Sequence, residues 1–458
     1  MKKWVTKKLS GKEYFGHPSG LFVLFLTEMW ERFSYYGMRA LLVLYMTQYL
    51  LKDPAKAQEV FGFNALQSFL ISTFGQLNIQ GMSSQIYGLY TGFVYFTPFF
   101  GGIIADKYLG QYRTVYLGGI LMAIGHFLMA SEQMFLLALL FLILGNGAFK
   151  PNISTQVGLL YKPGDKRRDG AFTIFYMGIN LGAMLSPLVC GTLGQKVGWH
   201  WGFGAAGVGM LLGLFVYWLG SDLIPRGEKV AKKTTEKKAP LTRDEWAGVV
   251  ALMVLCTLNI MFWAIYEQQG NTLQLWADER TNWMFLGFQV PSSWFQIMNP
   301  AMIVLFAPFL DRIWAKQAKK DREPNSVTKM GIGCILCGLA YVLMILAAKA
   351  TPEGERGSIM WLVGTVFVFT MGELYLSPIG LSLVTKVSPP QIVSMMMGAW
   401  FLSSFFGNYG TGYLGMFYSK MSKDAFFMML TVMGVVTGLI FILIRKPMQE
   451  ALGRRVKI

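Results

Sequence analysis

Twelve apolar segments alternate with more polar segments of varied length along the 458-residue chain. A helix needs about 20 residues to cross the hydrocarbon core of a bilayer. Charged residues make up 14% of the chain and hydrophobic residues 53%, whereas charged residues are about a quarter of a typical soluble domain. The segments cover residues 21–50, 83–104, 115–130, 134–160, 172–193, 201–224, 247–275, 293–309, 330–348, 360–384, 391–418 and 426–444. We therefore predict an all-α polytopic membrane protein.

A polar stretch divides these segments into two sets of six. Residues 226–243 contain five lysines, which is typical of a solvated linker. We expect an N-terminal six-helix bundle over residues 1–224, a cytoplasmic basic linker over 225–245, and a C-terminal six-helix bundle over 246–458. The second span of each half ends at an acid-base pair, Asp106-Lys107 and Asp311-Arg312. Duplicated halves are typical of a transporter that alternates access to a central cavity, although a channel is not excluded.

The positions of the basic residues indicate orientation in the membrane. With the N-terminus in the cytoplasm, thirty of the 41 Lys and Arg residues fall on the inner side and eight on the outer side. This asymmetry follows the positive-inside rule, so we expect both termini in the cytoplasm. It also explains the net charge of +16 without nucleic acid as a partner.

The four cysteines all lie within apolar segments, which predicts a packing role for Cys190, Cys256, Cys334 and Cys337. We expect no metal and no cofactor. The chain shows no Ser-His-Asp set and no nucleotide-binding loop, so an enzyme is not expected.

The first apolar segment carries four charges, Glu28, Glu31, Arg32 and Arg39. Charges at this depth cost a few kcal/mol each unless they face one another, water or a substrate. Glu28 and Arg32 are four residues apart, which places them on one face of a helix as a favourable pair. Helix-stapling salt bridges would explain part of this set, but Arg39 has no local acid. We interpret the stripe as part of a transport pathway.

The buried charges do not balance. The apolar segments hold Arg32, Arg39 and Lys150 against Glu28, Glu31, Glu267 and Glu373. The negative charge of the one surplus carboxylate could be balanced by a bound proton that is carried across or by a cationic substrate. The first motivates proton coupling.

Depth along the spans suggests partners for the remaining charges. Arg39 and Glu267 both lie past the middle of outward-running spans, so we predict that they pair as a periplasmic gate; a static pair is the alternative. Glu373 is the solitary acid of the second half, opposite Arg32 and Lys150. A small zwitterion would bridge these opposite charges.

Several other polar and aromatic residues accompany these charges. Asn180 and Asn299 are buried amides that would bind peptide groups, or else form helix-helix hydrogen bonds. Tyr35 and Tyr36 adjoin the charged stripe. Most other aromatics in such a chain pack or face the membrane interface.

Five segments resemble one family. The pattern Glu28-x-x-Glu31-Arg32-Phe33-x-Tyr35-Tyr36-Gly37 is similar to the first-helix motif of the proton-dependent oligopeptide transporters, within the major facilitator superfamily. Similar matches are Phe175-Tyr176-x-x-Ile179-Asn180-x-Gly182, Phe149-Lys150-Pro151-Asn152, Phe262-Trp263-x-x-Tyr266-Glu267-Gln268 and the loop over 102–113. The resemblance implies the major facilitator fold with twelve helices, because the linker is too short for the two extra helices of many bacterial members.

The resemblance also implies residue roles. Glu28, Glu31, Arg32 and Lys150 would couple proton and peptide, with Arg32 and Lys150 at the carboxylate end, and Glu373 would bind the peptide amino group. The pocket lining would comprise Tyr35, Tyr36, Tyr95, Asn180, Trp263, Asn299, Trp400 and Ser404. Animal members have a histidine near the outer end of helix two; this chain has only His17, His126 and His200, so that role is absent or met by another residue.

Taken with the buried charges, the resemblance implies a monomeric symporter of the bacterial inner membrane that imports di- and tripeptides with protons. The nearest alternative is a carrier of another small ion, such as nitrate or an organic acid, for which Glu373 would be a poor choice. A membrane peptide receptor or a channel is more remote.

Overall fold

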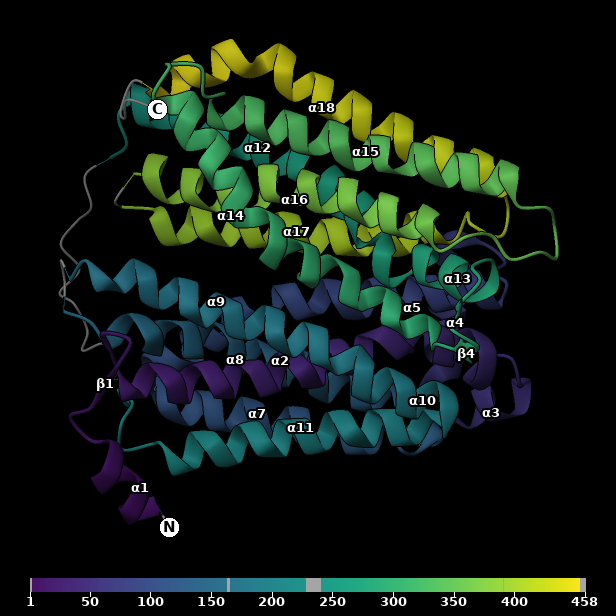
Figure 1. The fold of residues 1–458 in the computed structure, drawn as a ribbon, viewed down its shortest axis with the longest axis horizontal. Coiled ribbons are helices and arrows are strands. Elements are labelled where there is room, and N and C mark those ends of the chain that lie inside the picture. The colour runs from purple at the N-terminus through teal and green to yellow at the C-terminus, as the bar shows by residue number, and fades with distance from the viewer. Residues whose placement is uncertain (1, 163–164, 228–239, 390, 454–458) are drawn as a thin grey trace. The chain divides into compact units, whose positions relative to one another are not determined.

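The computed structural model describes residues 2–162, 165–227, 240–389 and 391–453 (Figure 1). Its contacts divide the chain into two compact units. Unit 1 comprises residues 1–79 and 93–233, and unit 2 comprises residues 80–92 and 234–458. Most of the predicted linker, residues 228–239, lies outside the described residues.

Unit 1 contains the first six spans, of which the second is shared with unit 2 through residues 80–92. Its spans are built from α2 (Ser19–Tyr45), α5 (Ile79–Phe96), α6 (Pro98–Ile104), α7 (Gln111–Leu128), α8 (Phe135–Leu159), α9 (Arg167–Ser186), α10 (Thr192–Lys196) and α11 (Trp199–Leu219). π-Helical turns η1 (Met46–Leu50), η2 (Ala105–Leu109) and η4 (Pro187–Gly191) extend α2, α6 and α9. Shorter elements are α1 (Lys2–Leu9), β1 (Glu13–Tyr14), β2 (His17–Pro18), α3 (Pro54–Glu59), α4 (Phe63–Phe74) and η3 (Glu132–Met134).

Unit 2 contains the last six spans. They are built from α12 (Arg243–Tyr266), η5 (Glu267–Gly270), α13 (Thr272–Glu279), η6 (Ser292–Ile297), α14 (Met298–Ala318), α15 (Ser326–Ala350), α16 (Met360–Val387), α17 (Val393–Gly415) and α18 (Lys423–Gly453). A small antiparallel hairpin, β3 (Met284–Phe285) and β4 (Phe288–Gln289), connects the seventh span to the eighth.

The predicted number of spans is confirmed. Nine stretches of the described chain are long and apolar enough to cross a membrane. The remaining three are α2, α7 and α17, with 27, 18 and 23 residues. The charges of α2 lower its hydropathy, and its central residues are buried by the other helices of the bundle.

The seventh span differs from the continuous helix that the sequence predicts. Helix α12 ends at Tyr266, and Glu267 begins the 3₁₀ turn η5 before α13 continues the span. The Gln268 side chain donates to the carbonyl oxygens of Ala264, at 3.3 Å, and Thr411, at 3.0 Å. A polar side chain thereby satisfies backbone acceptors that a break in the helix leaves free. Glu267 consequently lies in a turn.

Close packing of α9 against α2 fixes the helix that carries the charged stripe. Gly182 of α9 faces α2, and a Cβ atom at this position would overlap the carbonyl oxygen of Met29. It would also lie 3.0 Å from Cβ of Arg32. Small residues let membrane helices approach in this way. Gly182 therefore sets the distance between α9 and the backbone of Arg32.

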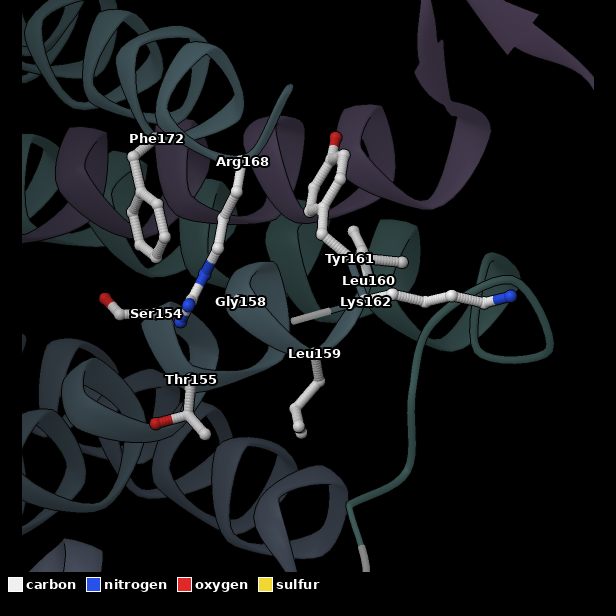
Figure 2. Close-up of a pocket in the computed structure, with 9 residues that line it drawn as sticks. All are labelled: Ser154, Thr155, Gly158, Leu159, Leu160, Tyr161, Lys162, Arg168 and Phe172. Atoms are coloured by element: carbon white, nitrogen blue, oxygen red, sulfur yellow. The ribbon is translucent and has the colours of Figure 1, made fainter. Parts of the chain in front are cut away.

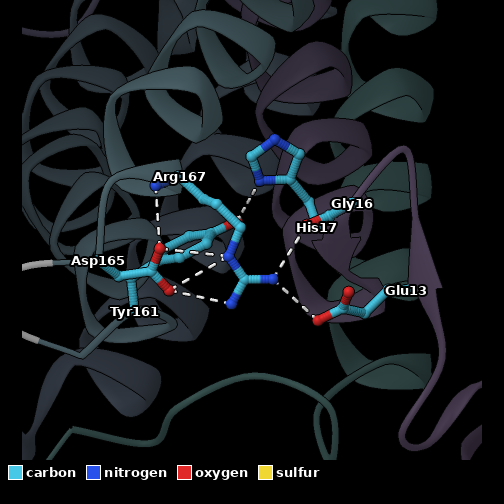
Figure 3. A network of polar contacts seen from close by, with 6 residues as sticks. All are labelled: Glu13, Gly16, His17, Tyr161, Asp165 and Arg167. Atoms are coloured by element: carbon cyan, nitrogen blue, oxygen red, sulfur yellow. Dashed lines mark hydrogen bonds and ion pairs between the residues drawn. The ribbon is translucent and has the colours of Figure 1, made fainter.

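A polar network joins the β1–β2 hairpin to the connection between α8 and α9 (Figure 3). Arg167 donates to Asp165 Oδ2 at 2.9 Å, to Glu13 Oε1 at 2.9 Å and to the Gly16 carbonyl oxygen at 3.1 Å. His17 and Tyr161 share a further hydrogen bond of 2.8 Å. The hydrogen bonds from Arg167 lower the pKa of Asp165, and those to Asp165 and Glu13 raise the pKa of Arg167. The network holds the β1–β2 hairpin against the connection between α8 and α9 within unit 1.

Candidate functional site

The centre of the site in unit 1 is the Arg32 guanidinium, which lies between two carboxylates of its own helix. Arg32 donates through Nη2 to Glu31 Oε1 at 2.6 Å and through Nε to Glu31 Oε2. Glu28 Oε1 is 3.3 Å from Nε. All three side chains are buried, and a buried guanidinium is stable only with such paired acceptors. The pair predicted from the four-residue spacing is present.

Asn146 of α8 is a partner that the sequence analysis missed. Its Nδ2 donates to Glu31 Oε1 at 3.3 Å. The available signal was a buried amide between two glycines, one helical turn before Lys150. Asn146 thus links α8 to the carboxylate that holds Arg32.

One carboxylate oxygen of Glu28 accepts no hydrogen bond from the described residues. This oxygen, Oε2, is buried. An unsatisfied carboxylate oxygen inside a protein is costly, and a proton on it reduces that cost. Lys150 acts electrostatically on the same carboxylate. Glu28 is therefore the carboxylate of this cluster best placed to gain and lose a proton.

Aromatic rings cover the cations of unit 1. The Arg32 guanidinium lies 5.0 Å from the Tyr35 ring and 5.9 Å from the Tyr36 ring. The Lys150 ammonium lies 4.8 Å from the Tyr95 ring. Cation–π contacts stabilise charges that are removed from water. The structure thus places Tyr35, Tyr36 and Tyr95 beside the two cations.

Glu373 of α16 lies in unit 2, and neutral side chains of two other helices donate to it. The Tyr266 hydroxyl donates to Glu373 Oε2 at 2.5 Å. Asn299 Nδ2 donates to the same oxygen at 3.0 Å and to Thr370 Oγ1 at 3.1 Å. Asn299 therefore makes the helix-helix hydrogen bond that was its alternative role. Within the described part of unit 2, no lysine or arginine forms an ion pair with Glu373.

Tyr266 was quoted as part of a motif but received no role from the sequence. It follows Trp263 by one turn of α12, and their rings meet at 5.6 Å. Its hydroxyl, on the seventh span, bonds to Glu373 on the tenth span, and a motif within one span does not reveal such a pairing. Tyr266 orients the Glu373 carboxylate.

The other predicted lining residues have structural contacts. Asn180 donates to the Tyr176 carbonyl oxygen of its own helix at 3.0 Å. Trp400 is buried against Gly380, where an added Cβ would overlap the indole. Ser404 is buried on α17, one turn from Trp400. Their roles in peptide binding stay predictions.

The predicted gate residues belong to different units. Arg39 lies on α2 of unit 1, 6.0 Å from the Tyr36 ring. Glu267 is buried in the η5 turn of unit 2. Their pairing stays a prediction.

Twelve membrane-spanning helices, with charged side chains buried on α2 and in the η5 turn, define a multi-pass membrane transporter. The chain belongs to the POT family, whose profile matches residues 112–242 and 224–433. It is 33% identical to a di-/tripeptide transporter of Lactococcus lactis subsp. cremoris, over 96% of this chain and 98% of the relative. It is also 33% identical to a peptide transporter of Yersinia enterocolitica, over 90% of each chain.

Solved structures agree with this assignment. A crystal structure of a peptide transporter POT in complex with sulfate is 32% identical, covers 99% of each chain and superposes with a TM-score of 0.84. A POT family transporter in complex with 5-aminolevulinic acid is 29% identical and covers 96% of this chain and 99% of its own, with a TM-score of 0.82. The major facilitator fold predicted from the sequence is confirmed.

Proposed function

We propose that the protein is a proton-coupled symporter that imports di- and tripeptides across the bacterial inner membrane. In this proposal the protein is a monomer with both termini in the cytoplasm. Relatives named as di-/tripeptide transporters, and a neighbouring structure with alafosfalin bound, support the substrate class. The observation that carries the proposal is the contrast between two polar clusters: unit 1 holds the cations Arg32 and Lys150 beside Glu28 and Glu31, and unit 2 holds Glu373, to which only neutral described side chains donate.

In this proposal the Glu373 carboxylate is oriented so that it can accept a hydrogen bond from the ammonium group of the peptide. Tyr266 and Asn299 both donate to Oε2, which leaves Oε1 available for another donor. A carboxylate that two donors already hold in place loses little freedom when a ligand binds. The peptide amino group binds Glu373, and the peptide carboxylate binds the Arg32 and Lys150 side. Recognition through the two termini leaves the peptide side chains loosely selected.

Proton coupling is assigned to the Glu28, Glu31 and Arg32 cluster. A proton on Glu28 would remove one of the two carboxylates that neutralise Arg32, which frees positive charge for the peptide carboxylate. Release of the proton would restore the internal pairing and weaken the hold on the peptide. Proton and peptide are thereby linked through one guanidinium.

The test is uptake of labelled dialanine into proteoliposomes that contain the full-length protein. We expect accumulation above the external concentration with an inward proton gradient and equilibration only without it. Equal accumulation of dialanine with and without the proton gradient would show that transport is not coupled to protons. Saturable uptake of nitrate or an organic acid, with no dialanine uptake, would instead support the alternative carrier.

A further inference from the structure

A pocket of about 780 Å³ lies within unit 1 between α8 and α9, away from the Arg32 cluster (Figure 2). Its walls include Ser154, Gly158 and Leu159 of α8 together with Arg168 and Phe172 of α9. Leu159 and Phe172 supply apolar surface, and both are well exposed. The pocket therefore combines one guanidinium with apolar walls.

The Arg168 guanidinium lies against α8 at Gly158, where the absence of a side chain leaves room for it. A Cβ atom at Gly158 would sit 2.9 Å from Arg168 Nη2. The neighbouring Arg167 is held by Asp165 and Glu13, whereas no ion pair between described residues includes Arg168. Figure 2 shows the Arg168 guanidinium next to Ser154 of α8, with Lys162 pointing the other way. Arg168 thus presents its donors to the pocket.

The pocket continues the helix that carries Lys150. Ser154 follows Lys150 by one turn, and its hydroxyl donates to the Lys150 carbonyl oxygen at 3.2 Å. Gly158 follows by another turn, so Arg168 crosses α8 about 12 Å along the helix from Lys150. This end of α8 leads into the connection that contacts the N-terminal hairpin, through Tyr161 with His17 and through Arg167 of α9 with Glu13. It is the cytoplasmic end if the termini are cytoplasmic.

We propose that Arg168 forms a second binding station for the carboxylate of the transported peptide, between Lys150 and the cytoplasm. This proposal rests on the proposed peptide transport. A carboxylate that leaves Lys150 loses a paired charge, and a guanidinium further along the same helix restores one before full hydration. Leu159 and Phe172 contact the peptide side chain without strong selection.

The test compares peptide entry from the two faces of the membrane. Right-side-out and inside-out vesicles are prepared from cells that express the full-length protein or the variants Arg168→Gln, Arg168→Lys, Gly158→Leu and Lys166→Gln. Lys166 is exposed in the same connection and does not line the pocket, so Lys166→Gln is the matched loss of one positive charge. The readout is the half-saturation constant for labelled dialanine.

We expect Arg168→Gln to raise this constant about tenfold in inside-out vesicles and to leave it unchanged in right-side-out vesicles. Gly158→Leu should act in the same direction because leucine occupies the place of the guanidinium. Arg168→Lys should retain most of the affinity, and Lys166→Gln all of it. Equal constants for wild type and Arg168→Gln at the cytoplasmic face would overturn the proposal, as would an equal shift at both faces.

Two further outcomes distinguish a lipid-binding pocket and a failure of peptide transport from the proposed role of Arg168. If Arg168→Gln loses bound phosphatidylglycerol in purified protein while transport from both faces is unchanged, the pocket holds a lipid headgroup and the proposal is wrong. If the wild type moves no dialanine in either kind of vesicle, the proposed function fails first. The latter result separates failure of peptide transport from failure of the Arg168 station.

Discussion

The Tyr266 hydroxyl donates a 2.5 Å hydrogen bond to Glu373 Oε2 and so joins the seventh span to the tenth. The Glu373 carboxylate is held on one oxygen and open on the other. This relationship turns an acid within a membrane span into an oriented acceptor. It also makes the contribution of Tyr266 measurable.

Tyr266→Phe removes this donor and keeps the aromatic ring. Hydrogen bonds to charged groups contribute about 1.5–3 kcal/mol, so we expect the half-saturation constant for dialanine to rise at least about tenfold. Tyr341→Phe is the matched control, since the Tyr341 hydroxyl donates to the Ile265 carbonyl oxygen instead of to Glu373. Equal effects of the two substitutions on the constant would show that Tyr266 has no special role at Glu373.

Glu28→Gln and Glu31→Gln test the coupling cluster. Each substitution removes a proton-binding group beside Arg32, so we expect uphill accumulation of dialanine to stop while exchange of internal for external dialanine continues. Glu59→Gln, at an exposed position of α3, controls for loss of a carboxylate. Proton-driven uptake that is unchanged in both variants would place the coupling elsewhere.

Gly182→Leu tests the packing that positions Arg32. The added side chain has no space between α9 and α2, and overpacking typically costs about 1–3 kcal/mol. We expect a lower unfolding temperature and weaker dialanine binding. Gly204→Leu in α11 is the control, because a Cβ there meets no atom within 4 Å. A Gly182→Leu protein as stable as wild type would contradict the close approach.

The network around Arg167 predicts a dependence on pH. The pKa of Asp165 is lower in the folded protein than in the unfolded chain, because Arg167 donates to its carboxylate. Its stabilising effect is therefore complete above the unfolded pKa and is lost as the pH falls through the lower folded value. Asp165→Asn should speed hydrogen exchange in the β1–β2 hairpin at pH 7.

Hydrogen exchange of wild type and Asp165→Asn, compared again at acidic pH, tests whether the charge of Asp165 stabilises the hairpin. The difference between wild type and Asp165→Asn should shrink as the wild-type carboxylate gains its proton. A difference that grows with acidity would mean that the charge of Asp165 does not hold the hairpin.

The sequence was sufficient for the parts of the site that depend on one helix. The spacing of Glu28 and Arg32 determines their contact whatever the rest of the fold does. Asn146 and Tyr266 depend on how α8 and α12 are rotated against their neighbours, and a single sequence carries little information on such rotations. Asn299 was identified as a buried amide, but its bond to Glu373 required the fold.

The break at Glu267 was missed for a related reason. Hydropathy over residues 247–275 is high enough for one continuous helix, and the segment does cross as one span. The turn depends on Gln268, whose partner Thr411 comes from α17. Tertiary hydrogen bonds here override a local helical pattern. The span count survives such a break, whereas the position of a side chain within it does not.

Recognition of a zwitterion, with its carboxylate at Arg32 and Lys150 and its ammonium at Glu373, is tested most directly by equilibrium binding to the purified protein. Dialanine, N-acetyl-dialanine and dialanine amide are compared, since the second lacks the ammonium and the third lacks the carboxylate. We expect each blocked peptide to bind at least about tenfold more weakly than dialanine. In the Glu373→Gln variant, dialanine and N-acetyl-dialanine should bind with nearly the same affinity. Equal affinity of the wild type for all three peptides would contradict binding through the two peptide termini.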